Sequence, residues 1–280
     1  MMKTFHYDVP TSKGYNMKYL NMLLITMLFT FGIWQVGITQ KTRYFEVKYS
    51  FGLNKTVVQD EWDNFMIYTH MKFQPVNIDL RYIENNWIQR LSIYYMTNKL
   101  NALNGEGQYS YNFVNIKLGE LNYDLLYQVY KSENQNFSVF AGLGVHGFGS
   151  LRHREFLNKQ YPYEDIVDSY DVNSGSLQIS AYPNFKTGKH FFGLSLSTGI
   201  LSYVSRPYFY NSRLTSDESK WEIVSFNKHF SLLSIVEYQL DISERFALSA
   251  EGRFLYYSYT FPYRLRVLNE NYLLGLIYKF

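Results

Sequence analysis

The stretch HGFGS at 146–150 holds a histidine and a serine, the residue types that act as base and nucleophile in many hydrolases. In an extended strand His146 and Ser150 share one face, but they lie roughly 13 Å apart along it. Proton transfer requires that base and nucleophile come within hydrogen-bond reach. We therefore interpret His146 as a structural residue and expect no enzymatic activity. A hydrolase with unrecognised catalytic residues is the less favoured alternative.

A second candidate site is the acidic stretch YPYEDIVDSYD at 161–171. Carboxylate oxygens are hard ligands that suit calcium. The four carboxylates belong to Glu164, Asp165, Asp168 and Asp171. Because their spacing does not match a calcium-binding loop, we favour a solvated loop and expect neither a metal nor a cofactor.

A third candidate is the stretch SRPYFYNSRLTSDESKW at 205–221, which mixes basic and aromatic residues. Its guanidinium groups, on Arg206 and Arg213, suit phosphate, and its tyrosines suit sugar rings. The stretch could contact lipopolysaccharide or the surface of another protein. Anchoring at a membrane interface explains the aromatic residues equally well.

Composition narrows the class of protein. The 280 residues include no cysteine, which excludes a disulfide framework and a thiolate metal site. The formal charge of +3 is too small to indicate nucleic acid binding. The chain has 28 Tyr and 22 Phe, yet its mean hydropathy is only −0.26. A transmembrane β-barrel explains this combination, because half of each strand faces lipid and half faces a polar lumen.

Residues 1–39 have the features of an export segment. Lys18 is followed by an apolar run at 20–33, and the small residues Gly37 and Thr39 precede Gln40. This order is typical of a cleaved signal peptide, preceded by an upstream extension if translation starts at Met1 rather than Met17. An uncleaved membrane anchor is the alternative, although the apolar run is short for a full span of ~20 residues.

Residues 40–280 are predicted to form one all-β domain. From Tyr44 to Leu53, apolar and polar residues alternate, as in a strand between an apolar and a polar medium. The same alternation recurs about ten times, which predicts an antiparallel up-and-down barrel of about 10 strands, with 8–12 possible. A soluble β-sandwich is the alternative, but it would rarely place so many aromatic residues on one face of each strand.

The predicted connections alternate in length. Short turns at 84–86, 132–136, 187–189 and 242–245 are rich in Asn, Gly, Ser and charge. Long polar connections are expected at 54–64, 98–114, 150–174, 205–225 and 261–270. Short turns on one side and long loops on the other are the arrangement of outer-membrane barrels, which would put both mature termini in the periplasm.

Alternation places charged residues inside the predicted barrel, where they form a lumenal charge network of Glu46, Lys48, Asp79, Arg81, Arg90, Asp124, Glu237, Glu251, Arg253 and Lys279. We expect Glu46 to pair with Arg81, Lys48 with Asp79, and Glu237 with Arg253, because buried charges must be paired. Large residues such as Tyr94, Tyr182 and Tyr257 would narrow the bore further. A filled lumen is favoured over the alternative, a narrow porin-like channel for small solutes.

The C-terminal strand alternates as Tyr272, Leu274, Leu276, Tyr278 and Phe280. With this ending, residues 40–280 resemble the small outer-membrane β-barrel proteins of Gram-negative bacteria. The resemblance implies that the terminal aromatic strand is the insertion signal read by the barrel assembly machinery, and that outer-membrane lipid and lipopolysaccharide are partners. We accordingly expect an integral outer-membrane protein with a structural or surface-binding role through its long extracellular loops.

Overall fold

The computed structural model describes residues 43–60, 67–102, 109–158, 165–208, 217–260 and 264–280. The proposed export segment lies outside these residues. Within them no helix is long and apolar enough to cross a membrane. The described secondary structure consists of strands: β1 (Arg43–Asp60), β2 (Ile67–Glu84), β3 (Trp87–Ala102), β4 (Tyr109–Lys131), β5 (Phe137–Asn158), β6 (Asp165–Thr187), β7 (His190–Tyr208), β8 (Asp217–Ser225), β9 (His229–Asp241), β10 (Phe246–Tyr259) and β11 (Leu265–Lys279).

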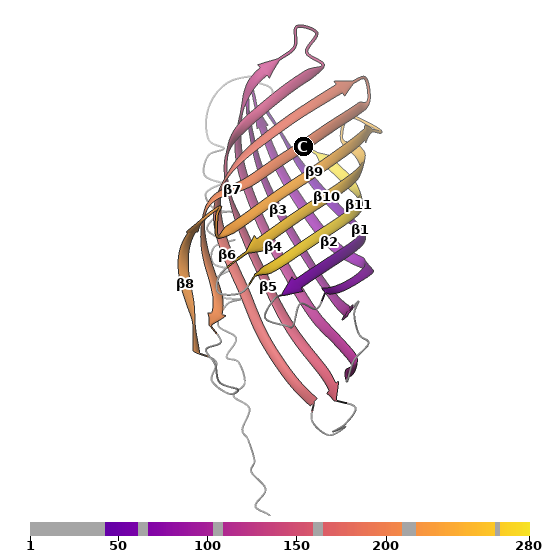
Figure 1. Ribbon diagram of the computed structural model, residues 1–280. Coiled ribbons are helices and arrows are strands. Elements are labelled where there is room, and N and C mark those ends of the chain that lie inside the picture. Colours follow the sequence, from indigo (N-terminus) through magenta and orange to yellow (C-terminus); the bar gives the residue numbers. More distant parts are fainter. Residues whose placement is uncertain (1–42, 61–66, 103–108, 159–164, 209–216, 261–263) are drawn as a thin grey trace, which may run out of the picture. The chain divides into compact units, whose positions relative to one another are not determined.

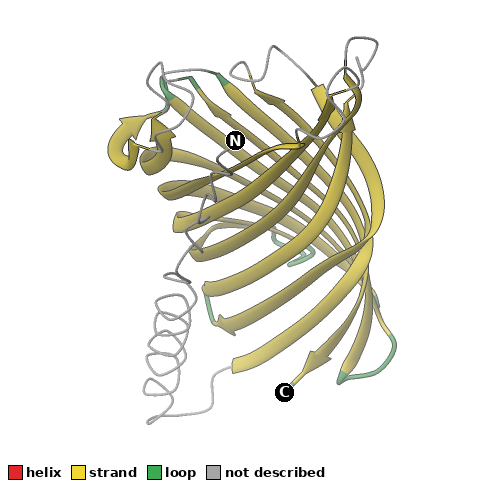
Figure 2. Ribbon diagram, turned by 90° about the horizontal axis from the view of Figure 1, so that it is seen from below, coloured by secondary structure: helices red, strands yellow, loops and turns green. Residues whose placement is uncertain are grey.

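The strands form a closed antiparallel barrel, as the alternation predicts. Each strand from β1 to β7 pairs with the next, β7 pairs with β9, and β9, β10 and β11 follow in order. Pairing of β11 with β1 closes the ring, which has 10 strands. Figure 1 follows the strands round this ring, and Figure 2 shows the same strands from below. Closure leaves no unpaired edge within the ring.

The strand that follows β7 is divided into two pieces. The first part of β7 pairs with β9 from His190 to Thr198, and its later part pairs with β8 from Leu201 onward. A turn of three residues, 226–228, separates β8 from β9. β8 therefore extends the ladder beyond the end of β9 and is not an additional strand of the ring (Figure 1).

Four short turns join the strands at one end of the barrel, at the predicted places. Three of them contain a residue with positive φ, as tight hairpins require: Asn85 at 51°, Gln135 at 60° and Gly188 at 55°. The fourth joins β9 to β10 and has the hydrogen bond from Ile242 N to Phe246 O, 2.9 Å long. Both Arg43 and Phe280 lie at this end, which we call the turn end.

The predicted long loops are wrong over much of their length, because strands continue through most of 98–114, 150–174 and 205–225. The reason is visible in β4. Near the turn end its outward side chains are apolar, such as Leu125 and Tyr123, and its inward ones are polar, such as Asp124. Beyond Gly119 the order reverses, so that Ile116 is buried inside and Lys117 is exposed outside. The alternation persists, but its two faces exchange character.

Neighbouring strands approach closely at Gly142 of β5. A Cβ atom at this position would lie 1.9 Å from the carbonyl oxygen of Leu125. A Cβ at Gly119, on the facing strand β4, would meet nothing within 4 Å. The two glycines therefore differ sharply in the room that they leave for a side chain.

Replacing Gly142 by valine should destabilise the barrel by about 3 kcal/mol, because β4 and β5 must separate to admit the side chain. Gly119→Val is the matched control and should cost less than about 1 kcal/mol. The unfolding free energy in urea, measured on detergent-folded protein, compares the two. Equal losses would show that the approach of the strands at Gly142 is not a constraint.

Candidate functional site

The candidate site is the barrel interior, where charged side chains gather in what we call the charged layer. It consists of Glu46, Lys48, Asp79, Arg81, Arg90, Glu237 and Glu251. Every one of these residues is at most 6 % exposed. They come from β1, β2, β3, β9 and β10, so the layer joins strands that are far apart in the ring.

Lys48 is the centre of the charged layer. Its ammonium group lies 2.6 Å from Asp79, which is its direct neighbour on β2, and 3.3 Å from Glu237, and it also contacts Glu251. Glu237 and Glu251 face each other directly on β9 and β10. Like charges at such positions repel, and the shared ammonium group of Lys48 offsets this repulsion.

Arg81 links β2 to the opposite wall. It lies directly across from Glu46 on β1, at 3.9 Å, and its guanidinium also contacts Glu237 on β9. The Tyr182 hydroxyl is 3.4 Å from the same guanidinium. Arg90 completes the layer through an ion pair of 3.2 Å with Asp79. The expected pairs Glu46–Arg81 and Lys48–Asp79 are therefore present.

The expected pair of Glu237 with Arg253 is wrong. The guanidinium of Arg253 on β10 contacts Glu120 on β4, five positions away in either direction round the ring. It also lies over the ring of Tyr94, 5.3 Å from its centroid. Adjacency along the hairpin suggested Glu237, but the side chain of Arg253 reaches across the lumen. This ion pair spans the full width of the barrel.

Glu120 also brings His146 into the interior. The His146 Nε2 atom lies 3.7 Å from the Glu120 carboxylate, and both side chains are buried. His146 is thus placed next to an acid instead of next to Ser150. Glu120 was missed at the sequence level, although the alternation of β4 would have placed it inside next to the outward Leu121.

Two other network residues lie apart from these contacts. Asp124 accepts hydrogen bonds from Asn122 (2.6 Å), Gln178 (2.9 Å) and Ser180 (2.6 Å), so amides and a hydroxyl surround it. Lys279 lies near the turn end, 2.6 Å from Asp241 and 4.0 Å from Glu46. Asp124 is therefore held by neutral donors, while Lys279 joins the network at its margin.

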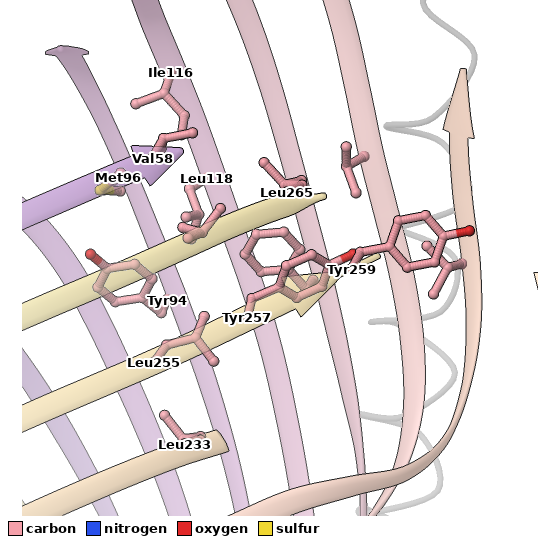
Figure 3. Close-up of a cluster of buried hydrophobic side chains, with 14 of the residues drawn as sticks. Val58, Tyr94, Met96, Ile116, Leu118, Leu233, Leu255, Tyr257, Tyr259 and Leu265 are labelled. Atoms are coloured by element: carbon pink, nitrogen blue, oxygen red, sulfur yellow. The ribbon is translucent and has the colours of Figure 1, made fainter. Parts of the chain in front are cut away.

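Apolar side chains lie in the lumen beyond the charged layer, towards the end of the barrel opposite the turn end, which we call the loop end. We call this cluster the apolar cap; its members are Val58, Tyr94, Met96, Leu100, Val114, Ile116, Leu118, Phe148, Val172, Val204, Val224, Leu233, Ile235, Leu255, Tyr257, Tyr259, Leu265 and Val267. In Figure 3 the labelled side chains, from β1, β3, β4, β9, β10 and β11, point into the barrel. Phe148 and Tyr257 stack with their centroids 4.6 Å apart.

A smaller apolar cluster lies nearer the turn end. It consists of Ile88, Leu126, Phe140 and Tyr182. The charged layer thus lies between two apolar clusters, and the expectation of a lumen closed mainly by charges needs correction. The sequence analysis placed Tyr94 and Tyr257 inside but missed most of the apolar cap, because many of its members, such as Val58 and Val172, fall in the predicted long loops.

The structure adds one histidine that sequence reasoning did not single out. His229 and Ser231 lie two residues apart on the inner face of β9, and both are buried. The His229 ring meets that of Tyr257 edge-on at 4.7 Å. His229 therefore packs as part of the interior beside the apolar cap.

The acidic stretch and the basic, aromatic stretch give no site that can be described. The side chains of Glu164, Asp165, Asp168 and Asp171 lie outside the described part, as do those of Arg206, Tyr208, Tyr210 and Arg213. Among the described side chains no group of three or more His, Asp or Glu is placed to hold a metal ion.

Alternate apolar side chains of the C-terminal strand β11 point outward from the barrel. Leu274 is 63 % and Phe280 is 70 % exposed, and Tyr272 and Leu276 share this outward face. The Phe280 amide donates to Phe45 O at 2.9 Å, and its ring lies 4.6 Å from that of Tyr278. The five residues therefore form a continuous apolar stripe on the strand that closes the ring.

Replacing Arg253 by methionine should lower the free energy of unfolding by about 3–5 kcal/mol, because the Glu120 carboxylate would remain buried without its partner. Adding Glu120→Gln to this variant should recover most of the loss. Urea titration in detergent micelles, followed by tryptophan fluorescence, measures both variants. If the single variant loses less than about 1 kcal/mol, the ion pair across the lumen does not support the barrel.

Comparison with known proteins gives the fold a context. No protein family and no curated protein sequence matches the chain. Among solved structures, the outer membrane protease OmpT of Escherichia coli aligns with a TM-score of 0.55 and 6 % identity, over 88 % of this chain and 99 % of OmpT. This likeness concerns the fold alone.

Two smaller proteins align less well. Ail of Yersinia pestis has a TM-score of 0.33 and 13 % identity, over 84 % of this chain and 98 % of Ail. Neisserial surface protein A has a TM-score of 0.34 and 9 % identity, over 85 % of this chain and 97 % of that protein. The fold of the chain is the β-barrel fold that it shares with OmpT.

Proposed function

We propose that the chain is an integral protein of the bacterial outer membrane with a non-enzymatic, structural or surface-binding role at its loop end. The exposed apolar residues on the outward faces of the strands support the membrane placement, since lipid is the solvent that such a surface requires. The four short turns lie at the turn end together with Arg43 and Phe280, the first and last described residues of the barrel, and this favours a periplasmic location for the mature termini.

Contacts between opposite walls of the lumen are the observation that carries this proposal. The Arg253–Glu120 ion pair joins opposite walls, and Arg81 reaches from β2 to Glu237 on β9. Further towards the loop end, Phe148 of β5 stacks on Tyr257 of β10. A barrel of about ten strands is only slightly wider than the eight-stranded kind that side chains fill. Such contacts favour a surface role over transport of solutes.

The proposed partners follow from the outer surface. Lipid would contact the exposed apolar residues on the outward faces of the strands, and lipopolysaccharide would contact these residues and the loop end of the barrel. The stripe formed by Tyr272, Leu274, Leu276, Tyr278 and Phe280 would be read by the barrel assembly machinery during insertion. The outward position of this stripe supports that role, because another protein can reach it before lipid covers it.

Purified protein inserted into planar bilayers should give no steady ohmic current, because the interior is blocked at the levels of Arg253 and Tyr257. Protease resistance in liposomes of the same lipid verifies that the barrel has inserted. Steady, voltage-independent openings would overturn the proposal and favour the narrow channel for small solutes. Ion selectivity would then be the next quantity to measure.

Replacing Phe280 by serine should slow insertion by the barrel assembly machinery several-fold. Spontaneous folding into detergent micelles should change little, because the ring is 70 % exposed and adds little to the packed interior. Ile242→Ser is the matched control, since Ile242 is 55 % exposed at the same end and is not part of the stripe. If Phe280→Ser slows spontaneous folding into micelles as much as it slows insertion by the assembly machinery, Phe280 acts through stability alone.

A further inference from the structure

The outer surface of the barrel contains a hollow of about 530 Å³ across β9, β10, β11, β1 and β2. Its floor is formed by Ala250 and Gly252, two consecutive outward positions of β10 that carry little or no side chain. Large side chains flank the floor, with Tyr238 on the β9 side and Tyr272 on the β11 side. We call this feature the outer groove.

The outer groove is continuous with the apolar surface that we propose to face the membrane. Phe51, Phe73 and Leu274 line it and are 48 %, 59 % and 63 % exposed. These residues lie near the middle of their strands, away from both ends of the barrel. Water is absent at that depth of a bilayer, so the natural occupant is a flexible hydrocarbon chain.

The turn end below the outer groove carries an excess of positive charge. Tyr238 lines the groove, and its hydroxyl lies 2.9 Å from Nδ1 of His190, the first residue of β7. The adjoining turns and strand ends carry three exposed basic residues, Lys186, Lys189 and Arg245, and two acidic ones, Asp241 and Glu244. Lys279 is not counted here, because it pairs with Asp241 and lies near Glu46 in the lumen. Backbone hydrogen bonds from Asp241 N to Lys189 O and from Lys279 N to Arg245 O, each 2.9 Å, hold these turns side by side.

The distance between the two features fits one molecule. Tyr238 is three residues from Asp241, the last residue of β9, which is roughly 10 Å along an extended strand. A headgroup at the turns would therefore place its acyl chain at the entrance of the outer groove. Anionic groups are attracted to clustered Lys and Arg at a membrane surface.

We infer that the outer groove binds an acyl chain of an anionic phospholipid from the leaflet at the turn end, whose headgroup lies against Lys189 and Arg245. The inference rests on the proposed membrane placement. The apolar walls hold the chain, the small floor residues leave room for it, and the basic turns select the headgroup charge.

Native mass spectrometry of the full barrel, purified in mild detergent and titrated with phosphatidylglycerol or phosphatidylethanolamine, tests this inference. Wild-type protein should retain phosphatidylglycerol preferentially. Ala250→Leu fills the floor and should weaken retention about fivefold, because methylene contacts are lost. Ala181→Leu, at an outward alanine of β6 outside the groove, is the matched control and should retain lipid as the wild type does.

Charge reversal separates the two parts of the site. Lys189→Glu combined with Arg245→Glu should abolish the preference for phosphatidylglycerol and leave the weaker binding of phosphatidylethanolamine. Loss of the preference together with the effect of Ala250→Leu supports the inference. Equal retention by the Ala250→Leu and Ala181→Leu variants would overturn it.

Other occupants give different results. If lipid A binds and phosphatidylglycerol does not, or if Ala250→Leu removes a dimer instead of bound lipid, the inference is overturned. If wild-type protein does not insert into liposomes at all, it is the proposed membrane placement that fails. Insertion without groove-dependent lipid binding refutes only the inference.

Discussion

The burial of charge inside a closed ring of strands is the constraint on which the structure depends. A desolvated ammonium or carboxylate is tolerated only with a counter-charge or with hydrogen-bond donors, and the counter-charges of Lys48 and Arg253 come from other strands. Lys48 of β1 gathers carboxylates from β2, β9 and β10, and Arg253 reaches Glu120 across the bore. Each such contact fixes the position of one wall relative to another. The backbone hydrogen bonds between paired strands fix only the positions of neighbouring strands.

The apolar cap also holds the walls of the barrel in position, by hydrophobic packing instead of ion pairs. On β4 the outward side chains beyond Gly119 become polar, as at Lys117, and the interior takes the apolar residues, as at Ile116. That part of the barrel resembles a soluble β-structure folded round its own core. The charged layer and the apolar cap therefore divide the interior between electrostatic and hydrophobic stabilisation.

Much of the fold was predictable because strand alternation and turn chemistry are local. The strand number, the short turns and the inward position of residues such as Lys48 follow from period two and from Gly or Asn at tight turns. The sequence does not reveal which charge reaches which across the lumen, because barrel shear decides it. Arg253 thus pairs with Glu120 of β4 instead of Glu237 of the adjacent strand. The exchange of outward and inward character beyond Gly119 was also missed, because the sequence does not show at which residue the apolar surroundings of β4 end.

That exchange of faces has a consequence for how the barrel would sit in a bilayer. On β4 the outward side chains change from apolar to polar at the level where the inward ones change in the opposite sense. Sinking the barrel by two residues would bring Lys117 towards hydrocarbon, and raising it would expose Leu125 or Tyr123 to water. Both displacements cost free energy. On β4, the exchange at Gly119 therefore favours one immersion depth, and a membrane of different thickness would have to deform to meet this strand.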